Sequence, residues 1–391
     1  MNTGKIVIVG GGHAAAQLCM NLAEAGRGPD ITLISEETVV PYQRPPLSKS
    51  FLKSSAESLQ FIRGQTWYEE QGIELMLGAQ AVGIDRESRR INLSSGVFMD
   101  YQHLVLATGA RARPFPGIPP GTVNAFSLRG QADARALQTL LAEPQDILVL
   151  GGGFIGLEFS ATASAKGHRV VLVEAAPRLM ARAVSPQLSA HALQVQRDLG
   201  VEVHLQAQLG EPVMEEQRFL GLHIDGEFKQ FSSVLSAIGA WPNQELAGQC
   251  GLVCDNGIWV DLHMRTSDPS ILAIGDCARF ALSGKPWLPA SLRLESIQNA
   301  NDQAKTASST IMGDPQPYHA LPWFWSEQGP ARFQMAGLLP AVISRTEVVE
   351  GGSSGACSWH HFDGDGQLAC VESVNFPADH MKAKKQLLSI W

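Results

Sequence analysis

A strand, three glycines and a helix follow one another near the start of this chain, and this order constrains the fold more than any other feature. The apolar, β-branched run Ile6–Val9 predicts a buried strand, and Gly10-Gly11-Gly12 follows it directly. A helical pattern comes next, and then a second apolar run, Ile31–Ile34, which ends close to Glu36. This order is typical of the strand–turn–helix–strand unit that binds dinucleotides.

The same unit occurs again much later in the chain. The run Ile147–Leu150 leads into Gly151-Gly152-Gly153, and a helical pattern separates these glycines from the run Val170–Val173, which ends at Glu174. Strands that are joined through a helix in this way lie parallel in one sheet. The two copies therefore predict an α/β protein with two dinucleotide sites.

Three small residues define each glycine turn. The first turn has Gly10, Gly12 and Ala15, and the second has Gly151, Gly153 and Gly156. The first position permits a tight turn, the second lets the backbone approach a pyrophosphate, and the third needs a small side chain for helix–strand packing. Amide groups at the helix N-terminus then face the phosphates. We expect Glu36 and Glu174 each to accept hydrogen bonds from an adenosine ribose.

Glu174 also predicts which nicotinamide dinucleotide is used. A carboxylate at this place binds the 2′-hydroxyl of NADH and repels the 2′-phosphate of NADPH. Ala175 and Ala176 follow it and offer no cation, and Arg178 comes a turn later. We therefore predict that kcat/KM is higher with NADH than with NADPH by at least about tenfold.

Composition and charge disfavour several other classes of protein. The chain has 391 residues, a formal net charge of −8 and a sequence pI of about 5.8, which disfavours nucleic acid as a partner. No apolar stretch approaches the roughly 18 residues of a membrane span, and Ile6–Val9 is too short for a signal peptide, so we expect a cytoplasmic protein without a membrane span. The six cysteines form no CxxC pair and no zinc spacing, so no metal site is expected.

Four segments together resemble one family. They are Pro41–Lys49 (PYQRPPLSK), Gly151–Glu158 (GGGFIGLE), Thr266–Phe280 (TSDPSILAIGDCARF) and Glu295-Ser296. They are similar to segments of the FAD-dependent NADH–ferredoxin and NADH–rubredoxin reductases that serve oxygenases, and the resemblance runs from Lys5 to about Gly337. It implies FAD and NADH as cofactors. It also implies a glutathione-reductase-like fold with two Rossmann-type domains and a small α+β C-terminal domain.

The order of strands and loops predicts where these domains lie. The loop Arg113–Gly121 and the segment Ala237–Asn243 are interpreted as crossings between domains, and the apolar run Ile271–Ile274 as a central parallel strand of the first domain. After Pro315, turns alternate with short apolar runs such as Ala341–Ile343. We therefore expect a discontinuous FAD-binding domain at 1–112 and 242–315, an NADH-binding domain at 113–241 and the C-terminal domain at 316–391.

The resemblance also implies a reactive pair of side chains. Lys49 would lie beside the flavin N5, and its partner would be Glu158, in the first turn of the helix that follows the second glycine turn. The pair would orient the nicotinamide and balance the charge of the reduced flavin. Asp276, at the end of a strand, would bind a ribityl hydroxyl, and the amides of Ser296 and Ile297 at a helix N-terminus would face the pyrimidine edge of the flavin.

The expected cofactor residues combine the two turns with the residues that the resemblance implies. For FAD they are Gly10, Gly12, His13, Ala14, Ala15, Glu36, Arg44, Lys49, Ala81, Ala107, Thr108, Gly109, Arg129, Asp276, Glu295, Ser296, Ile297 and Trp325. For NADH they are Gly151, Gly153, Phe154, Ile155, Gly156, Glu158, Glu174 and Gly239. A catalytic role is assigned to Lys49 and Glu158. Arg44 and Arg129 are expected to approach the phosphates or the adenine side of FAD.

The aromatic segment Pro322–Gln328 (PWFWSEQ) resembles the PWFWSDQ of the same family. The resemblance implies that Trp325 lies near the flavin, on the face where electrons leave, whereas Trp323 suits a hydrophobic core equally well. The chain departs from the family directly afterwards, because Gly329-Pro330 stands where relatives have an aromatic and an acidic residue.

These features predict an enzyme that takes a hydride from NADH onto FAD and passes single electrons to a small iron–sulfur protein, a [2Fe–2S] ferredoxin that serves an oxygenase. Ferredoxins of this kind tend to be acidic, and this chain also carries net negative charge. Docking therefore requires a local basic patch, for which Arg63, Arg293, Lys382, Lys384 and Lys385 are candidates.

Other activities are known on the same fold. Disulfide reductases and thiol-dependent peroxidases need a cysteine beside the flavin, but none occurs between Cys19 and Cys250, so thiol chemistry is disfavoured. Two alternatives stay open at this point. One is a redox-sensing flavoprotein resembling apoptosis-inducing factor, and the other is a direct NADH:quinone or NADH:oxygen reductase.

Overall fold

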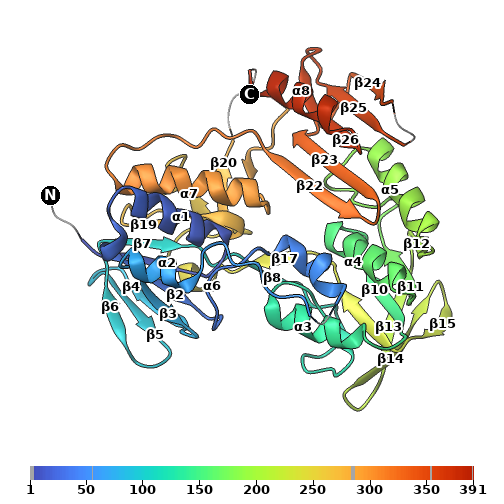
Figure 1. The fold of residues 1–391 in the computed structure, drawn as a ribbon, viewed down its shortest axis with the longest axis horizontal. Helices are drawn as coiled ribbons and strands as arrows, with labels where there is room; N and C mark the ends of the chain where they lie inside the picture. Colours follow the sequence, from blue (N-terminus) through green and yellow to red (C-terminus); the bar gives the residue numbers. More distant parts are fainter. Residues whose placement is uncertain (1–3, 55, 283–286, 353–354, 390) are drawn as a thin grey trace. The chain divides into compact units, whose positions relative to one another are not determined.

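The computed structural model describes residues 4–54, 56–282, 287–352, 355–389 and 391 (Figure 1). Its chain forms two units. The first comprises Met1–Gln43, Gln60–Arg111 and Trp241–Trp323, and the second comprises Arg44–Leu59, Ala112–Ala240 and Phe324–Trp391. The second unit thus holds residues 44–59 together with most of the ranges expected for the NADH-binding and C-terminal domains. The three-domain division remains a prediction.

A parallel five-stranded sheet forms the centre of the first unit. Its strands lie in the order β19 (Ile271–Ala273), β7 (His103–Leu106), β1 (Ile6–Val9), β2 (Ile31–Ser35) and β3 (Glu74–Leu77). Every residue of β1, β2 and β19 is buried, as expected for apolar strands that are covered on both faces. The predicted parallel α/β architecture is confirmed here.

β19 lies at the edge of this sheet, although its apolar run predicted a central strand. Residues 264–266 cover its outer side: the Ala273 amide donates to the Met264 carbonyl, and the Thr266 amide donates to the Ile271 carbonyl. The expectation was wrong because this short antiparallel segment buries an edge strand as fully as a central one.

Two helices of the first unit, α1 (His13–Glu24) and α7 (Ile297–Ile311), pack against each other, as Figure 1 shows. α1 buries Leu18 and Leu22, and α7 buries Ala300 and Ala304, the faces that their helical patterns predicted. β8 (Ala110–Ala112) and β17 (Ala240–Pro242) form a two-stranded sheet. The other elements are η1 (Gly28–Asp30), α2 (Gln65–Glu70), β4 (Ala81–Asp85), β5 (Arg90–Leu93), β6 (Phe98–Asp100), α6 (Glu245–Gln249), β18 (Ile258–Val260), η4 (Gly275–Cys277), β20 (Ala278–Ala281) and β21 (Ser291–Leu292).

The second unit contains a parallel sheet of its own. The strand order is β12 (Glu202–Leu205), β11 (Arg169–Glu174), β10 (Asp146–Leu150), β16 (Ser233–Ser236) and β9 (Ala125–Phe126). α4 (Phe154–Ala165) connects β10 to β11, so the second glycine turn also lies between a strand and a helix. The other elements are η2 (Pro45–Ser48), η3 (Ser50–Leu52), α3 (Gln131–Leu140), α5 (Pro186–Asp198), β13 (Leu209–Glu215), β14 (Arg218–Ile224) and β15 (Glu227–Gln230).

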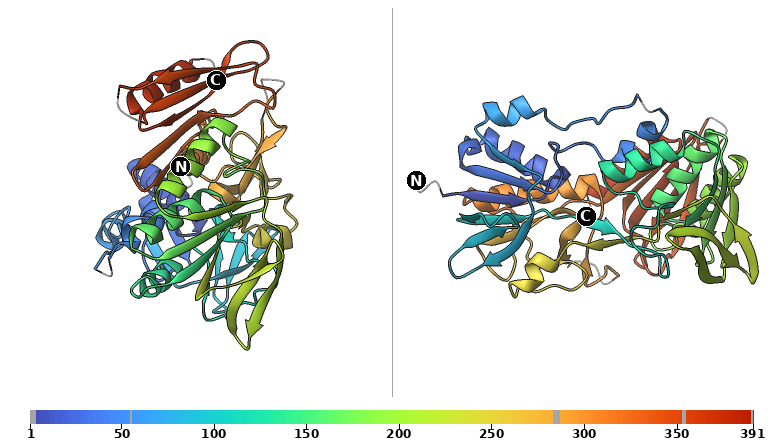
Figure 2. Two further views of the ribbon diagram at one scale, coloured as in Figure 1. Left: turned by 90° about the vertical axis from the view of Figure 1, so that its right-hand side faces the viewer. Right: turned by 90° about the horizontal axis from the view of Figure 1, so that it is seen from below.

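An antiparallel sheet and one helix form the C-terminal part of the chain. The strand order is β22 (Trp323–Gln328), β23 (Ala331–Gly337), β26 (Leu368–Val374), β25 (Cys357–Phe362) and β24 (Arg345–Glu350). α8 (Pro377–Leu388) packs on β26 and β23 (Figure 2). The apolar run Ala341–Ile343 lies in the loop before β24, with the Val342 side chain largely exposed, so this run is not a core strand.

The departure after Gln328 is a turn. Gly329 has a φ of 57°, in the left-handed region, and Gly329-Pro330 connects β22 directly to β23. No helix in the described ranges is long and apolar enough to cross a membrane. Within the same ranges, no group of three or more His, Cys, Asp or Glu side chains is placed to hold a metal ion.

Candidate active site

The first glycine turn joins β1 to α1. Gly10 has a φ of 122°, and a Cβ atom there would lie 2.1 Å from the Ala107 carbonyl oxygen of the neighbouring strand end. The backbone conformation and the close approach therefore both require glycine at this position. A Cβ on Gly12, by contrast, would have no atom within 4 Å. Ala15 is fully buried, as its packing role predicted.

The second turn, between β10 and α4, repeats this arrangement with one addition. Gly151 has a φ of 106°, and its Cβ would lie 2.6 Å from the Ala237 carbonyl oxygen. A Cβ on Gly156 would lie 2.2 Å from the Gly151 carbonyl oxygen, so this position requires glycine as well. The nearest atom to a Cβ on Gly153 would be 4.0 Å away.

The middle glycines test whether a dinucleotide fits. Gly12 and Gly153 cap their helices with φ values of −97° and −83° and extended ψ, which any residue type adopts. Neither backbone strain nor packing against this chain explains the missing side chain. The space in front of each helix N-terminus is what a pyrophosphate needs to approach the amides. The residues present therefore fit dinucleotides at both turns.

The two predicted ribose acids differ in their surroundings. Glu36 is exposed beyond β2, and no donor among the described residues contacts its carboxylate. Glu174 accepts hydrogen bonds from the Gly152 amide to Oε2 and from the Ala176 amide to Oε1, both at 2.7 Å. Arg178, the nearest cation in sequence, donates to the carbonyls of Ala181 and Val184 at 2.7 Å. Its guanidinium is thus held by its own loop.

Two predicted FAD residues, Ala107 and Thr108, lie against the first turn, because a Cβ on Gly10 would be 2.1 Å from the Ala107 carbonyl oxygen and 3.2 Å from the Thr108 nitrogen. Thr108 follows β7, and its hydroxyl donates to the Asn243 carbonyl at 2.6 Å. Arg293 donates to the Asp276 carbonyl at 2.9 Å and pairs with Glu295 at 2.6 Å. Ser296 caps α7, because its hydroxyl accepts the Asn299 amide.

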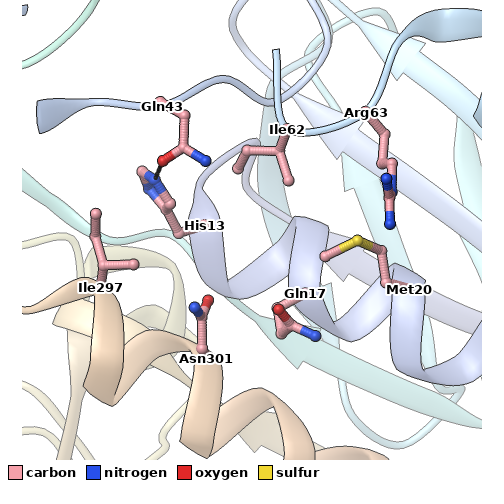
Figure 3. A pocket seen from close by; sticks show the side chains of 8 residues that line it. All are labelled: His13, Gln17, Met20, Gln43, Ile62, Arg63, Ile297 and Asn301. Carbon is pink, nitrogen blue, oxygen red and sulfur yellow. Dashed lines mark hydrogen bonds between the residues drawn. The ribbon is translucent and has the colours of Figure 1, made fainter. Parts of the chain in front are cut away.

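A pocket of about 260 Å³ opens between α1, α7 and the loops near them (Figure 3). Two of its lining residues, His13 and Ile297, are predicted FAD residues. The His13 ring is hydrogen-bonded to the Gln43 side-chain oxygen at 2.9 Å. The remaining lining residues are Gln17, Met20, Ile62, Arg63 and Asn301. Arg63 is the one lysine or arginine among the eight residues that line the pocket.

The predicted reactive pair forms in the second unit. The Lys49 ammonium lies 2.6 Å from Glu158 Oε2, and the two side chains are 16% and 5% exposed. The Ser48 hydroxyl donates to the same oxygen at 2.5 Å. Ser326 donates to Oε1 at 2.8 Å, and the Glu327 amide approaches that atom at 3.3 Å. Because α4 begins at Phe154, Glu158 is its fifth residue and lies one turn later than predicted.

β22 contacts the beginning of α4 at a second point. The rings of Phe154 and Phe324 pack with centroids 4.5 Å apart, and Trp325 lies beside Phe324 with 6.4 Å between ring centroids. The strand that carries the predicted flavin-side tryptophan therefore also carries contacts to the NADH-side helix.

Three further predicted residues have the following surroundings. Arg44 donates to the Arg129 carbonyl at 2.9 Å in the second unit. Ala81 begins β4 in the first unit. Gly239 is exposed after β16, and its Cβ position is 3.6 Å from the Arg182 guanidinium. The cofactor roles of all these residues remain predictions.

Known proteins of similar sequence and structure identify the family. Residues 4–304 match the family model described as pyridine nucleotide-disulphide oxidoreductase, and residues 323–389 match the one described as reductase C-terminal. The chain belongs to the pyridine nucleotide-disulphide oxidoreductase family. It is an oxidoreductase, and the resemblance seen in the sequence is confirmed.

Three relatives of this oxidoreductase carry specific names. Rhodocoxin reductase of Rhodococcus erythropolis is 41% identical over 387 residues, which cover 98% of this chain and 89% of that protein. The crystal structure of the ferredoxin reductase for the CYP199A2 system of Rhodopseudomonas palustris has a TM-score of 0.89 at 38% identity, covering 96% and 92% of the two chains. The covalent putidaredoxin reductase–putidaredoxin complex gives a TM-score of 0.90 at 35% identity, covering 98% and 92%.

Four cysteines of the oxidoreductase have thiols whose pKa is raised by burial. Burial raises the pKa of the Cys19 thiol to about 12 and also raises the pKa of Cys277, which follows Asp276. Burial likewise raises the pKa of Cys250 and Cys254. Because the thiolate is the reactive form, a raised pKa disfavours nucleophilic chemistry by these thiols at neutral pH.

Sequence reasoning missed several residues of the oxidoreductase's site. Ser48 and Ser326 hold the Glu158 carboxylate, Gln17 and Gln43 line the pocket, and Arg182 lies near Gly239. Ser48 adjoins Lys49 and Ser326 adjoins Trp325, so both lie inside segments that were already singled out. The sequence signal was therefore present, but a serine between named residues carries no spacing pattern of its own.

Proposed function

We propose that this protein is an NADH-dependent ferredoxin reductase. The observation that carries the proposal is the pair of glycine turns, each with unfilled space before a helix N-terminus, in a chain 41% identical to rhodocoxin reductase over nearly its whole length. The turn at Gly10 would hold FAD, and the turn at Gly151 would hold NADH. Bound FAD accepts a hydride from NADH and releases electrons singly, which suits a one-electron carrier.

The chain's own residues would orient the reactants. Lys49 and Glu158 form an ion pair in which the carboxylate is buried and the lysine is 16% exposed, and the lysine's charge balances an anionic neighbour. Glu174, held by two backbone amides, would present its carboxylate to the adenosine ribose and select NADH over NADPH. The reaction would take place in the cytoplasm, where NADH is supplied and cysteines stay reduced.

The proposed partner is a small [2Fe–2S] ferredoxin that serves an oxygenase. Of the basic candidates, Arg63 is exposed at the pocket, and Lys382 and Lys385 are exposed on α8. Arg293 is a poorer candidate than expected, since its side chain is 11% exposed and its guanidinium is engaged by the Asp276 carbonyl and Glu295. Electrostatic docking predicts that raising ionic strength slows ferredoxin reduction.

The proposal is tested by stopped-flow mixing of the FAD-loaded protein with NADH, followed by a panel of ferredoxins and rubredoxins. Rapid flavin bleaching and ferredoxin-dependent reduction of cytochrome c are expected. Turnover that is equally fast without any carrier would point to a quinone or oxygen reductase. Slow turnover with every acceptor would point to a redox sensor. A purified protein that takes up no FAD would overturn the proposal.

A further inference from the structure

The Glu158 carboxylate is held on both oxygens by segments that lie far apart in the chain. Oε2 receives the Ser48 hydroxyl and the Lys49 ammonium. Ser48 is the last residue of η2, and Lys49 follows it. Oε1 receives the Ser326 hydroxyl and the Glu327 amide from β22. All four donors reach one side chain that is 5% exposed. Each of the two carboxylate oxygens is therefore hydrogen-bonded by the protein itself.

Ser326 is the neutral counterpart of Lys49 in this arrangement. Its side chain is completely buried, and it directly follows Trp325 in β22. Two further contacts fix β22 against α4. The Phe154 and Phe324 rings pack together, and the Gln196 amide bridges the Leu157 carbonyl and the Gln328 side chain at 3.0 Å each. These contacts hold β22 beside α4, and β22 presents the Ser326 hydroxyl to Glu158.

A carboxylate bound through one oxygen alone can still turn about its last torsion, which has a broad energy profile. A donor on the second oxygen sets the plane of the group. Lys49, with three donor hydrogens on a flexible stem, does not impose such a plane by itself. Ser326 is placed to do so, because it contacts the oxygen that Lys49 does not.

We propose that Ser326 is a positioning residue for the Lys49–Glu158 pair. It holds the Glu158 carboxylate in one orientation, so that Oε2 faces Lys49, and it links the pair to the strand that carries Trp325. The inference rests on the proposed function, since it assumes that the pair serves hydride transfer from NADH.

The test compares Ser326→Ala with Ser326→Thr, which keeps the hydroxyl, and with Ser358→Ala as a matched control. Ser358 is also a fully buried serine of the same sheet, but its hydroxyl has no hydrogen-bond partner among the described residues. In the FAD-loaded protein, Ser326→Ala should slow the limiting rate of flavin reduction by roughly 10- to 100-fold, the loss expected for a hydrogen bond to a charged group. Ser326→Thr should restore most of the rate, and Ser358→Ala should leave it unchanged.

Two further measurements separate positioning from a merely structural role. NAD⁺ affinity, measured by calorimetry, should change by less than about threefold in Ser326→Ala, because the effect lies in orientation rather than binding. In a Glu158→Gln background, adding Ser326→Ala should cost less than about threefold in rate, since the group that it orients is gone. Effects that multiply independently in this double-mutant cycle would overturn the proposal.

Failure of this inference is distinguishable from failure of the proposed function. If NADH does not reduce the flavin of the unaltered protein, the proposed function is wrong. If the unaltered protein is reduced rapidly and Ser326→Ala is as fast, only the role of Ser326 is lost. If Ser358→Ala slows flavin reduction as much as Ser326→Ala does, the role of Ser326 is also lost, because the loss of any buried hydroxyl in this sheet would then have the same effect. The melting temperatures of all variants show whether each one is folded.

Discussion

The two glycine turns have the same order of residues, but their surroundings differ at the third motif position and at the fifth residue of the helix that follows. In the first, the third position holds Ala15, and in the second a Cβ on Gly156 would lie 2.2 Å from the Gly151 carbonyl oxygen. The fifth helical residue also differs. It is Gln17 in α1, whose amide donates to Asn21, and Glu158 in α4, whose carboxylate binds four donors.

This comparison separates the requirements of the fold from those of a ligand. Gly10, Gly151 and Gly156 are required because backbone atoms of this chain stand where a Cβ would be. Gly12 and Gly153 face space that the chain leaves unfilled. The motif expects a tight turn at the first position, phosphate approach at the second and close packing at the third, and the distances agree with that division.

The largest expected effect comes from removing the partner of Glu158, the charged fifth residue of α4. Lys49→Met leaves the buried Glu158 carboxylate without its cation, which should cost roughly 3–5 kcal/mol of unfolding free energy. It should also slow flavin reduction by NADH by about 100-fold. Stopped-flow reduction and thermal unfolding measure the two effects. Lys53→Met, an exposed lysine of the same loop, is the control. A normal rate of flavin reduction in Lys49→Met would remove Lys49 from the mechanism.

The third position gives the next largest effect. Gly156→Ala forces a Cβ against the backbone and should lower the unfolding free energy by about 3 kcal/mol. The reciprocal change, Ala15→Gly, removes a methyl from a helix and should cost only about 1 kcal/mol. Urea unfolding of both variants measures the difference. Equal losses would mean that the two turns pack alike, against the distances described above.

Much of this fold could be predicted from the sequence, because the apolar runs of β1, β2, β7 and β10 mark parallel strands that are buried on both faces. An apolar run did not reveal the place of β19, because a neighbouring segment buries this edge strand as fully as a central one. Nor does an apolar run always mark a strand, because Ala341–Ile343 lies in a loop. The Lys49–Glu158 pair came from a family resemblance, since no local pattern relates two residues 109 positions apart. Their serine partners followed from neither source.

The middle glycines should separate binding from stability. Gly12→Ala and Gly153→Ala place a methyl in open space at an ordinary backbone conformation, so the stability of the apoprotein should change by less than about 1 kcal/mol, with a gain permitted. The same methyl would stand in the path of a pyrophosphate and should weaken binding by roughly 10- to 100-fold. Gly12→Ala should affect FAD alone, and Gly153→Ala should affect NADH alone. Fluorescence titration with FAD and calorimetry with NAD⁺ distinguish them, and a loss of both ligands in either variant would contradict the assignment of one cofactor to each turn.

The smallest effect concerns the two acids, where the turns look alike in sequence and differ in anchoring. Glu174 is held by the Gly152 and Ala176 amides, whereas Glu36 is exposed without such donors among the described residues. An anchored carboxylate cannot turn away from a 2′-phosphate, so the unaltered enzyme should prefer NADH over NADPH by at least about tenfold in kcat/KM. Glu174→Ala should reduce that ratio mainly by lowering the value for NADH, and it should not create strong NADPH use, because Arg178 is already bound to the Ala181 and Val184 carbonyls. Steady-state kinetics with both dinucleotides measure the ratio, with Glu36→Ala as the control that should leave it unchanged. Equal rates with NADH and NADPH in the unaltered enzyme would show that the anchored acid does not select the cofactor.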